Sequence, residues 1–557
     1  MSQMRARRSD TEISPEFGMA ERRTLMKGIG FTDEELSRPF VGIVNGAGEV
    51  SPSSTHLDKI TNAIKKGVIA SGGTPQEFRI SSACVGVCIG GENYRWTLVY
   101  RDIVAAYIEC MAEMNYFDAL VFVPCCDDTI PAHLMALTRL NLPSIMMTGG
   151  YMPDGFYNGR PINVGEFHKA RGQLKTGEIT EEEYKRLEDV CITGCGGCPG
   201  MYTDITMSTL TEALGLSLPR TAITCGRDIE LERIAYNAGK QVISLWEQGT
   251  TPLDIVNEES FINAIKVHQA VAGSTNAVLH MLAVANELDL DVDIEAWNRA
   301  SKEVPVICDV IPVGKHRVSE LDHAGGVPAL LKELAPVLNT GVLTVTGKTL
   351  KENLENVGGG YNFREVIHPL NKPLFEEGGL CILKGNLAPG GAVVKQAGIP
   401  EELKRFKGEA RVFDSEREAQ EYGKKVKPGD VLVIRYYGPR GDPGMRQCGN
   451  LLSNMLTGMH VQNSVAIVTD GRFSGSNIGL IIGHVSPEAA VGGTIAVVKN
   501  GDLIEIDLPK RKLEVKISEE EIRRRLASWK APEPKIKKGF LAVYQELASQ
   551  ADKGAAL

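Results

Sequence analysis

The stretch that decides the fold is Ala119–Gly150, ALVFVPCCDDTIPAHLMALTRLNLPSIMMTGG. It opens with an apolar run, Ala119–Pro124, that is typical of a buried strand. The residues after Pro131 predict a helix, because proline suits the first helical turn and the Asp pair before it suits an N-cap. A second apolar run, Ser144–Thr148, predicts the next strand. Strand, helix and strand in this order indicate an α/β domain.

Farther along the chain the pattern of apolar and polar residues changes. Apolar runs and amphipathic stretches alternate through the first two thirds, whereas strand signals dominate from about Leu380. The runs Asp430–Tyr437 and Ser464–Thr469 both predict strands. The predicted fold class is therefore α/β, with an N-terminal α/β domain over residues 1–375 and a smaller β-rich, β-barrel-like C-terminal domain over residues 376–557.

A hairpin is also predicted in the C-terminal domain. Asn500-Gly501 is a strong two-residue turn signal. It lies between two apolar runs, Thr494–Val498 and Leu503–Ile506. We therefore expect these runs to pair as antiparallel strands.

Bulk composition excludes several classes of protein. The 557 residues carry a net charge of −9, with 43% hydrophobic and 24% charged residues. The absence of a long basic run argues against a nucleic-acid surface. No apolar stretch reaches the roughly 18–20 residues that span a bilayer. The N-terminal residues lack the apolar core of a secretory signal, so we expect a cytoplasmic protein.

The twelve cysteines are unevenly spaced. In a reducing compartment such grouping favours metal ligation over disulfides. The isolated cysteines are better explained as small buried apolar side chains. The grouped thiols are Cys84, Cys88, Cys125, Cys126, Cys191, Cys195 and Cys198.

Several polar or thiol-bearing segments each follow a predicted strand. In open α/β sheets, ligands bind beyond the carboxyl ends of the strands. Each segment alone is explained as a surface turn, but five of them together indicate a shared site. They are Ser82–Gly91, Cys125–Thr129, Thr193–Tyr202, Gly438–Cys448 and Thr469–Ser476.

Two short motifs point elsewhere. Gly347-Lys348-Thr349 looks like the end of a phosphate-binding loop, but the preceding glycine has the wrong spacing and no strand-loop-helix context surrounds it. Cys195 and Cys198 have the spacing of a thiol–disulfide pair. A redox domain would leave the other thiol segments unexplained.

Eight longer phrases, in order, resemble the dihydroxy-acid and sugar-acid dehydratase family, and the resemblance runs from about Gly42 to Val515. The phrases lie at residues 126–145, 198–220, 271–283, 323–334, 343–354, 378–395, 433–445 and 469–490; the last reads TDGRFSGSNIGLIIGHVSPEAA.

The resemblance implies a reaction and its cofactors. Members of the family convert a 2,3-dihydroxy acid to a 2-keto acid. An iron–sulfur cluster (2Fe–2S or 4Fe–4S) activates the departing hydroxyl, a nearby Mg²⁺ holds the substrate, and a serine acts as the base. The family also implies an α/β domain, a β-rich domain and a homodimer or homotetramer.

Carried over by position, the catalytic residues are Ser474 and Arg472, in the phrase Arg472-Phe473-Ser474-Gly475. The matching cluster cysteines are Cys126 and Cys198. A third cluster cysteine follows a proline in many members, but here Pro52 is followed by Ser53. That ligand is missing from this chain.

The Mg²⁺ ligands are altered as well. Of the family's ligand positions, one aspartate falls at Val85, the next is kept as Asp127, a carbamylated lysine becomes Asp128, and a glutamate falls at Gln447. Because Mg²⁺ prefers hard, mostly anionic oxygen ligands, Asp127, Asp128 and Gln447 form at most a remnant of that site.

Additional thiols accompany these losses. Soft thiolate ligands select iron–sulfur clusters over Mg²⁺. The sequence therefore predicts a cluster bound by Cys126, Cys198 and one or more other thiols. The candidates for those further ligands are Cys84, Cys88, Cys125 and Cys195.

The predicted function is that of a hydro-lyase that dehydrates a small 2,3-dihydroxy or sugar acid to a 2-keto acid, with the cluster as Lewis acid. Branched-chain acids of amino-acid biosynthesis and aldonic acids both remain open as substrates. One alternative is an iron–sulfur protein of the same fold that has lost dehydration and serves redox, sulfur chemistry or sensing. Another is a thiol–disulfide protein that uses Cys195 and Cys198.

Overall fold

The computed structural model describes residues 5–15, 17–448, 452–453, 456, 461–475 and 479–557. The N-terminal part is built on a parallel sheet with strand order β2-β1-β3-β4. Its interior strands are wholly buried because Val and Ile side chains fill both faces. The strands are β1 (Phe40–Asn45), β2 (Thr74–Arg79), β3 (Ala119–Val123) and β4 (Ser144–Met146).

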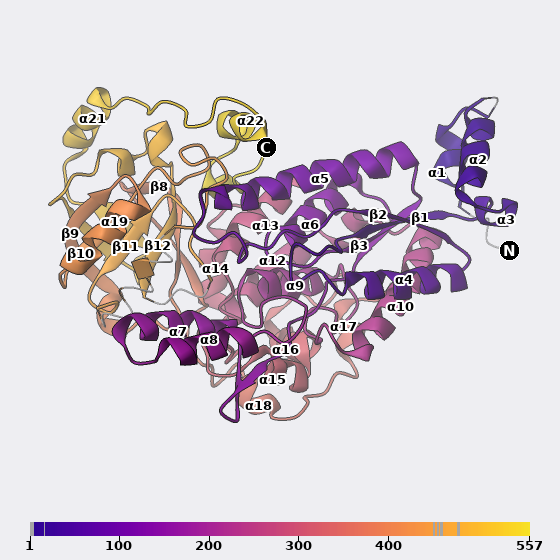
Figure 1. The fold of residues 1–557 in the computed structure, drawn as a ribbon, viewed down its shortest axis with the longest axis horizontal. Helices are drawn as coiled ribbons and strands as arrows, with labels where there is room; N and C mark the ends of the chain where they lie inside the picture. The colour runs from indigo at the N-terminus through magenta and orange to yellow at the C-terminus, as the bar shows by residue number, and fades with distance from the viewer. Residues whose placement is uncertain (1–4, 16, 449–451, 454–455, 457–460, 476–478) are drawn as a thin grey trace.

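Helices cover both faces of this sheet. Figure 1 shows α4 (Leu57–Ala70) and α10 (Ile229–Gln248) on one face, with α5 (Trp96–Asn115) and α6 (Thr129–Leu140) on the other. The predicted strands at residues 119 and 144 and the helix between them are therefore confirmed. Pro131 lies in the first turn of α6, where its missing N–H leaves no helical bond unmade.

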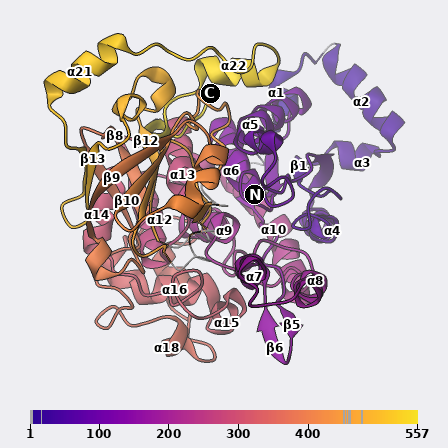
Figure 2. The same ribbon diagram turned by 60° about the vertical axis from the view of Figure 1, so that its left-hand side comes forward.

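A broad helical layer surrounds the sheet and extends toward the C-terminal part, while α7, α8 and the β5–β6 pair lie at the periphery (Figure 2). The remaining elements of the N-terminal part are α1 (Arg8–Glu12), α2 (Gly18–Ile29), α3 (Asp33–Leu36), β5 (Gly155–Tyr157), β6 (Arg160–Ile162), α7 (Val164–Thr176), α8 (Glu181–Val190), α9 (Thr203–Ala213), α11 (Pro252–Ile255), α12 (Glu258–Ala270), α13 (Asn276–Glu287), α14 (Ala296–Glu303), α15 (Val318–His323), α16 (Gly326–Leu334), α17 (Leu350–Leu354) and α18 (Phe363–Val366).

The C-terminal part is a closed barrel with strand order β10-β11-β12-β8-β7-β14-β13-β9. This confirms the expected β-rich, barrel-like fold; the boundary between residues 375 and 376 stays a prediction. Closure satisfies the hydrogen bonds that open sheet edges would leave unmade. The elements are β7 (Leu380–Gly385), β8 (Ala388–Lys395), β9 (Arg405–Phe413), α19 (Glu416–Tyr422), β10 (Asp430–Ile434), β11 (Ala466–Thr469), β12 (Leu480–Ser486), β13 (Leu503–Asp507), β14 (Lys512–Val515), α21 (Glu519–Ser528) and α22 (Phe540–Leu547).

The predicted hairpin through Asn500-Gly501 is wrong. Thr494–Val497 forms a short 3₁₀ helix, and β13 pairs with β9 and β14 instead. The turn itself exists, since Gly501 has φ 86° and Asn500 Oδ1 accepts a hydrogen bond from Val412 N over 2.7 Å. Both edges of β13 are occupied in the closed barrel, so the run before the turn has no strand to join.

The two parts are joined at α14. Asn298 exchanges two hydrogen bonds with Ile382 of β7, one to its carbonyl over 3.0 Å and one from its N–H over 2.9 Å. The side-chain amide thus extends the barrel's ladder into the helical layer. Figure 2 shows the barrel beside α12, α13 and α14.

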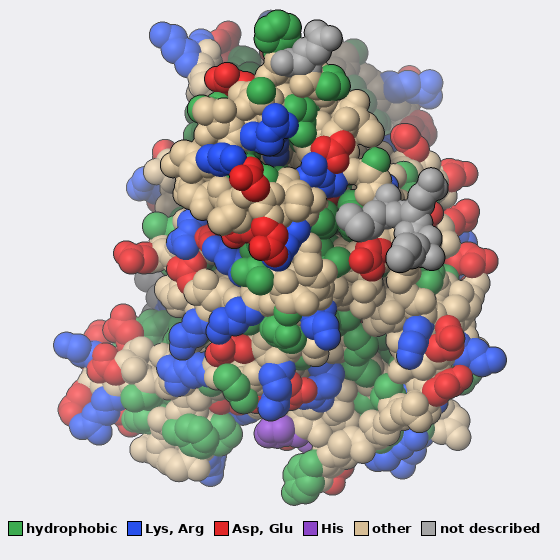
Figure 3. All heavy atoms as spheres, turned by 90° about the vertical axis from the view of Figure 1, so that its right-hand side faces the viewer, with side chains coloured by type: hydrophobic (Ala, Val, Ile, Leu, Met, Phe, Trp, Pro, Cys, Tyr) green, Lys and Arg blue, Asp and Glu red, His purple; other side chains and the backbone are tan. Residues whose placement is uncertain are grey.

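The surface is mixed in charge. On the face drawn in Figure 3, basic and acidic side chains alternate over the whole area, with no broad patch of one sign. Within the described residues, no helix combines the length and the apolar character needed to cross a bilayer.

Candidate active site

The loops that follow β1, β2 and β3 leave the parallel sheet at the same edge and are bonded to one another. Gly46 N donates to Val123 O over 3.0 Å, and Ser82 N donates to Gly46 O over 2.9 Å. A Cβ at residue 46 would lie 2.7 Å from the Val123 carbonyl oxygen and 2.8 Å from the Ser82 hydroxyl. Glycine at this position therefore allows the three loops to pack closely, which brings the thiol segments after β2 and β3 together.

Three thiols from separate segments gather at this edge. The thiol of Cys126 donates a hydrogen bond to Cys84, and this contact lowers the pKa of Cys84 to about 6. Burial raises the pKa of Cys198, and the nearby Asp127 and Cys84 add to the rise. Cys84 and Cys198 nevertheless keep part of their surface accessible.

The backbone at Cys126 is strained. Its φ is 88°, a value that side-chain-bearing residues rarely adopt. Its N–H donates to Asp204, in the first turn of α9. Strain of this kind concentrates at functional sites, where the surroundings hold the unfavourable geometry. Asp204 thereby positions Cys126, a role that the sequence alone did not indicate.

The other candidate thiols have different surroundings. Cys125 is fully buried, and its Sγ lies 3.5 Å from Asp204 Oδ2. The Cys88 thiol points to the carbonyls of its own loop, at 3.6 and 3.5 Å, and burial raises its pKa to about 11. Cys195 lies near Cys225, whose pKa it helps to raise after the larger effect of burial.

Arg472 reaches this edge from the loop after β11. Its guanidinium, 1% exposed, lies 3.2 Å from Asp128 Oδ1 and donates to Thr97 Oγ1 over 3.0 Å and to Met445 O over 2.8 Å. His280 Nε2 lies 3.5 Å from the same Asp128 oxygen. A barrel side chain is thus fixed against the loop that carries Cys126, so the candidate site is formed by both parts of the chain.

Ser474 lies in the same loop as Arg472, and Gln447 lies in the segment between β10 and β11. Gln447 forms a bridge with Arg472, and the adjacent Cys448 N donates to Arg472 O over 2.8 Å. Ser474 is half-buried, two residues beyond Arg472. The structure therefore brings the predicted catalytic residues close to the predicted thiol segments.

Lys395 was missed by the sequence analysis. It ends β8, and its Nζ donates to Gly475 O over 3.3 Å, beside Ser474. Burial lowers the pKa of this amine to about 7. The available signal was a lysine directly after the apolar residues Ala392–Val394, because burial at such a position lowers the pKa of an amine.

The residues present do not fit Mg²⁺. Val85 is apolar, Gln447 is neutral, and Asp128 is already paired with Arg472. Across the part of the chain that the structure describes, no three His, Cys, Asp or Glu side chains surround one point closely enough to bind a single metal ion. An iron–sulfur cluster makes a different demand, because its own iron and sulfide atoms separate the thiolates that bind it. The gathered thiols Cys84, Cys126 and Cys198 fit that demand.

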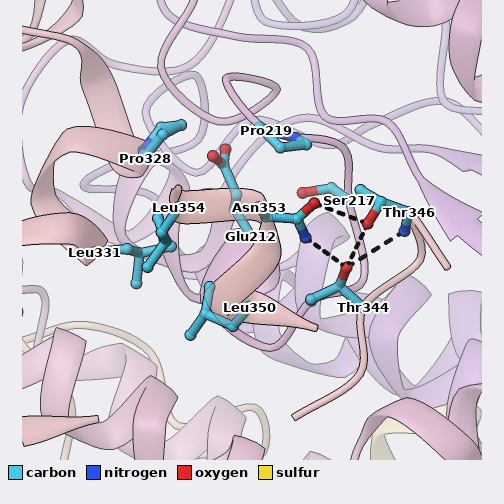
Figure 4. Close-up of a pocket in the computed structure, with 11 residues that line it drawn as sticks. Glu212, Ser217, Pro219, Pro328, Leu331, Thr344, Thr346, Leu350, Asn353 and Leu354 are labelled. Atoms are coloured by element: carbon cyan, nitrogen blue, oxygen red, sulfur yellow. Dashed lines mark hydrogen bonds between the residues drawn. The ribbon is translucent and has the colours of Figure 1, made fainter. Parts of the chain in front are cut away.

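The hollow drawn in Figure 4 is lined by none of the predicted site residues. Figure 4 shows Thr344, Thr346 and Asn353 bonded to one another beside Glu212 and Ser217. The Asn353 amide donates to Thr344 Oγ1 over 2.8 Å, and Thr346 Oγ1 donates to Asn353 Oδ1 over 3.0 Å. Thr349, from the false phosphate-loop motif, caps the N-terminus of α17 instead.

Comparisons with known proteins cover nearly the whole chain. The family model described as dihydroxy-acid/6-phosphogluconate dehydratase N-terminal matches residues 38–353, and its C-terminal counterpart matches residues 365–555. A dihydroxy-acid dehydratase of Caldanaerobacter subterraneus is 46% identical over 96% of this chain and 97% of its own length. One from Archaeoglobus fulgidus is 45% identical over 99% of this chain and 100% of its own. The chain therefore belongs to the dihydroxy-acid/6-phosphogluconate dehydratase family.

Proposed function

We propose that this chain is an iron–sulfur hydro-lyase that converts a 2,3-dihydroxy acid to a 2-keto acid. Full-length relatives of 42–46% identity, all named dihydroxy-acid dehydratase, support that activity. The observation that carries the proposal is the joint site, in which Arg472 of the barrel is fixed against Asp128, next to the thiols Cys126 and Cys84.

The reaction needs three groups. The proton at C2 is weakly acidic and requires a base, the carboxylate requires a cation, and hydroxide is a poor leaving group that requires a Lewis acid. Cys126 and Cys198 would hold the cluster, and Cys84, Cys88, Cys125 and Cys195 are the candidates for its further ligands. When bound, the cluster supplies the Lewis acid for the departing hydroxyl.

Arg472 positions the two loops of the site. Its guanidinium is 1% exposed and is fixed by Asp128, Thr97 and Met445, so it holds the barrel loop that carries Ser474 against the loop that carries Cys126. Because Asp128 balances its charge, Arg472 acts through these loops and does not bind the substrate carboxylate directly.

Ser474 is the proposed base for the C2 proton. Its hydroxyl must first lose a proton, and Lys395 is the titratable amine beside its loop. Because burial lowers the pKa of Lys395 to about 7, the amine is neutral in part at neutral pH and can accept a proton there.

Two further expectations remain proposals. The protein is expected to form a homodimer or homotetramer, and to act in the cytoplasm on a small hydroxy acid, with no nucleic-acid partner. The low net charge density and the mixed surface in Figure 3 agree with a small-molecule enzyme.

The test is turnover by anaerobically purified protein. Iron and sulfide are counted, and 2-keto acid formation is measured with a branched 2,3-dihydroxy acid and with an aldonic acid. We expect a cluster-containing protein whose electron paramagnetic resonance signal shifts on adding the accepted acid, and loss of turnover in Ser474→Ala. A full cluster with no turnover of any acid and no spectral shift would contradict the proposal.

A further inference from the structure

Cys84 stands apart from the other candidate thiols in its contact with a proposed cluster ligand. Its sulfur is hydrogen-bonded directly to the thiol of Cys126, and Cys198 lies nearby. Cys84, Cys126 and Cys198 come from three different loops. These three thiols are brought together by the tertiary fold, whereas Cys195 and Cys198 are close because of their spacing in the sequence.

The other three candidate thiols are directed mainly toward other groups. Cys125 is directed to Asp204, Cys88 to the carbonyls of its own loop, and Cys195 lies beside Cys225. Cys125 also accepts a hydrogen bond from the backbone N–H of the adjacent Cys126, but its side chain is fully buried, whereas Cys84 keeps part of its surface accessible. Within the described residues, Cys84 is therefore the thiol best placed to bind the same group.

Cys84 also lies beside the position where the resemblance predicts a cysteine. Ser51 hydrogen-bonds Cys84, and the same Ser51 hydroxyl is hydrogen-bonded to the hydroxyl of Ser53. Ser51 and Ser53 are both buried in the loop after β1, and that loop is bonded to the loop after β2 through Gly46 and Ser82. The buried Ser51 side chain thus lies between the Cys84 thiol and Ser53, the position at which the resemblance predicts a cysteine.

We infer that Cys84 is the third thiolate ligand of the cluster and that the loop after β2 supplies the ligand that the loop after β1 lacks. On binding, iron replaces the thiol proton, which passes to solvent, so no oxidant or reductant is needed. The inference rests on the proposed iron–sulfur function and adds the ligand set Cys84, Cys126 and Cys198.

Iron and sulfide content test the inference by substitution. Cys84→Ser is expected to lose most of its iron or to show a changed electron paramagnetic resonance spectrum, because oxygen is a harder ligand than thiolate. Cys110→Ser, on the exposed face of α5, is the control and should keep the wild-type spectrum, because this thiol is not among the candidate ligands. In the double variant Cys84→Ser with Ser53→Cys, the thiol returns to the neighbouring loop, and we expect cluster content to recover.

Alkylation of the wild-type protein avoids any folding defect of a variant. Iodoacetamide is applied to the protein with and without its cluster, and the modified cysteines are identified by mass spectrometry. Cys84 is partly accessible, so it should react in the cluster-free protein and be protected in the holoprotein. The exposed Cys110 should react in both and serves as the internal reference.

The outcomes separate this inference from the proposed function. Wild-type iron content and spectrum in Cys84→Ser, together with equal alkylation of Cys84 in wild-type protein with and without its cluster, would overturn the ligand assignment. The proposed function would still stand if the wild-type protein converted a dihydroxy acid. A wild-type protein that binds no iron after anaerobic reconstitution would overturn both.

Discussion

At the scale of single residues, the ion pair of Asp128 and Arg472 joins the barrel to the thiol-bearing loop and determines whether Asp128 can bind a metal. Both side chains are buried, and their charges lie 3.2 Å apart. A buried charge is tolerated only when paired, so each residue requires the other. The pair also occupies Asp128, a carboxylate that would otherwise be available to a metal.

Turnover should therefore be independent of Mg²⁺. Protein dialysed into Mg²⁺-free buffer is expected to keep its kcat and KM, because Val85 and Gln447 offer no anionic oxygen. The measurement is a Mg²⁺ titration of initial rates at constant iron content. A saturable rise in rate with Mg²⁺ would show that Asp127 and Asp128 still form a working site.

Removal of one partner of the pair should destabilise the fold. Asp128→Ala leaves the Arg472 charge buried and unpaired, which costs about 3–5 kcal/mol of unfolding free energy. Urea denaturation measures the change. Glu421→Ala is the control, because the Arg417–Glu421 pair is exposed and should contribute no more than about 1 kcal/mol. Equal losses in the two variants would mean that burial of the pair has no special weight.

Lys395 should set the pH dependence of the rate. Its pKa is lowered to about 7 by burial, so the amine is protonated below that pH and can accept the Ser474 proton only above it. The facing imidazole, His268, has a pKa of about 3 and stays neutral throughout. We expect kcat/KM to rise with pH through about 7. In Lys395→Gln this rise should vanish and kcat should fall by about 10²-fold or more, since an amide cannot accept the proton.

At the scale of elements, glycines set how closely helices α4 and α10 approach. A Cβ at Gly67 would lie 2.0 Å from Tyr236 O, and one at Gly239 would lie 2.1 Å from Ile64 O. The two backbones therefore touch at reciprocal positions. The contact therefore holds α4, the helix that follows the loop carrying Ser51 and Ser53, against α10.

Gly67→Ala should force α4 and α10 apart and cost about 1–3 kcal/mol of unfolding free energy through overpacking. Gly28→Ala, inside α2, is the matched control. Nothing lies within 4 Å of the added Cβ there. Alanine is the better helix former, so the control should gain about 0.5–1 kcal/mol. Thermal unfolding of both variants measures whether each change lowers or raises stability. An increase in stability in both variants would disprove the close contact.

At the scale of the whole molecule, the last described residues hold the two parts together. The fully buried Arg101 of α5 donates to Gly554 O over 3.1 Å and to Ala555 O over 2.9 Å. Arg101 Nη1 also lies 3.4 Å from His280 Nδ1. Since His280 contacts Asp128, a continuous set of buried polar groups runs from residues 551–557 to the candidate site.

Removal of residues 551–557 should leave Arg101 without its two backbone acceptors, at a cost of about 1.5–3 kcal/mol for each lost hydrogen bond, while Asp102 still balances its charge. Arg101→Met should cost less in the truncated protein than in the full chain, because the backbone acceptors that it would leave unpaired are already absent. Denaturant unfolding of the two single changes and of the combination gives the coupling. Strict additivity of the two changes would argue against the contact.

Several elements were predictable because their causes are local. The apolar run at Ala119, proline in the first turn of α6 and the strand at Ser144 are set by neighbouring residues, and the structure confirms all three. The Asn500-Gly501 turn was also local, but its pairing was not, because barrel closure decides which strands flank β13. The family and the two-part fold followed from long ordered phrases, and the comparisons confirm them.

The sequence by itself determined the fold class, the family and the set of thiols and polar residues from which a site could be built. It did not determine which of those thiols meet. Cys84 reaches Cys126, while Cys125 turns to Asp204, although Cys125 adjoins Cys126 in the chain. Nor could it pair Asp128 with Arg472 of the barrel. The physical reason is that adjacent residues point in different directions, whereas parallel strands and close packing at Gly46 bring distant loops to one edge.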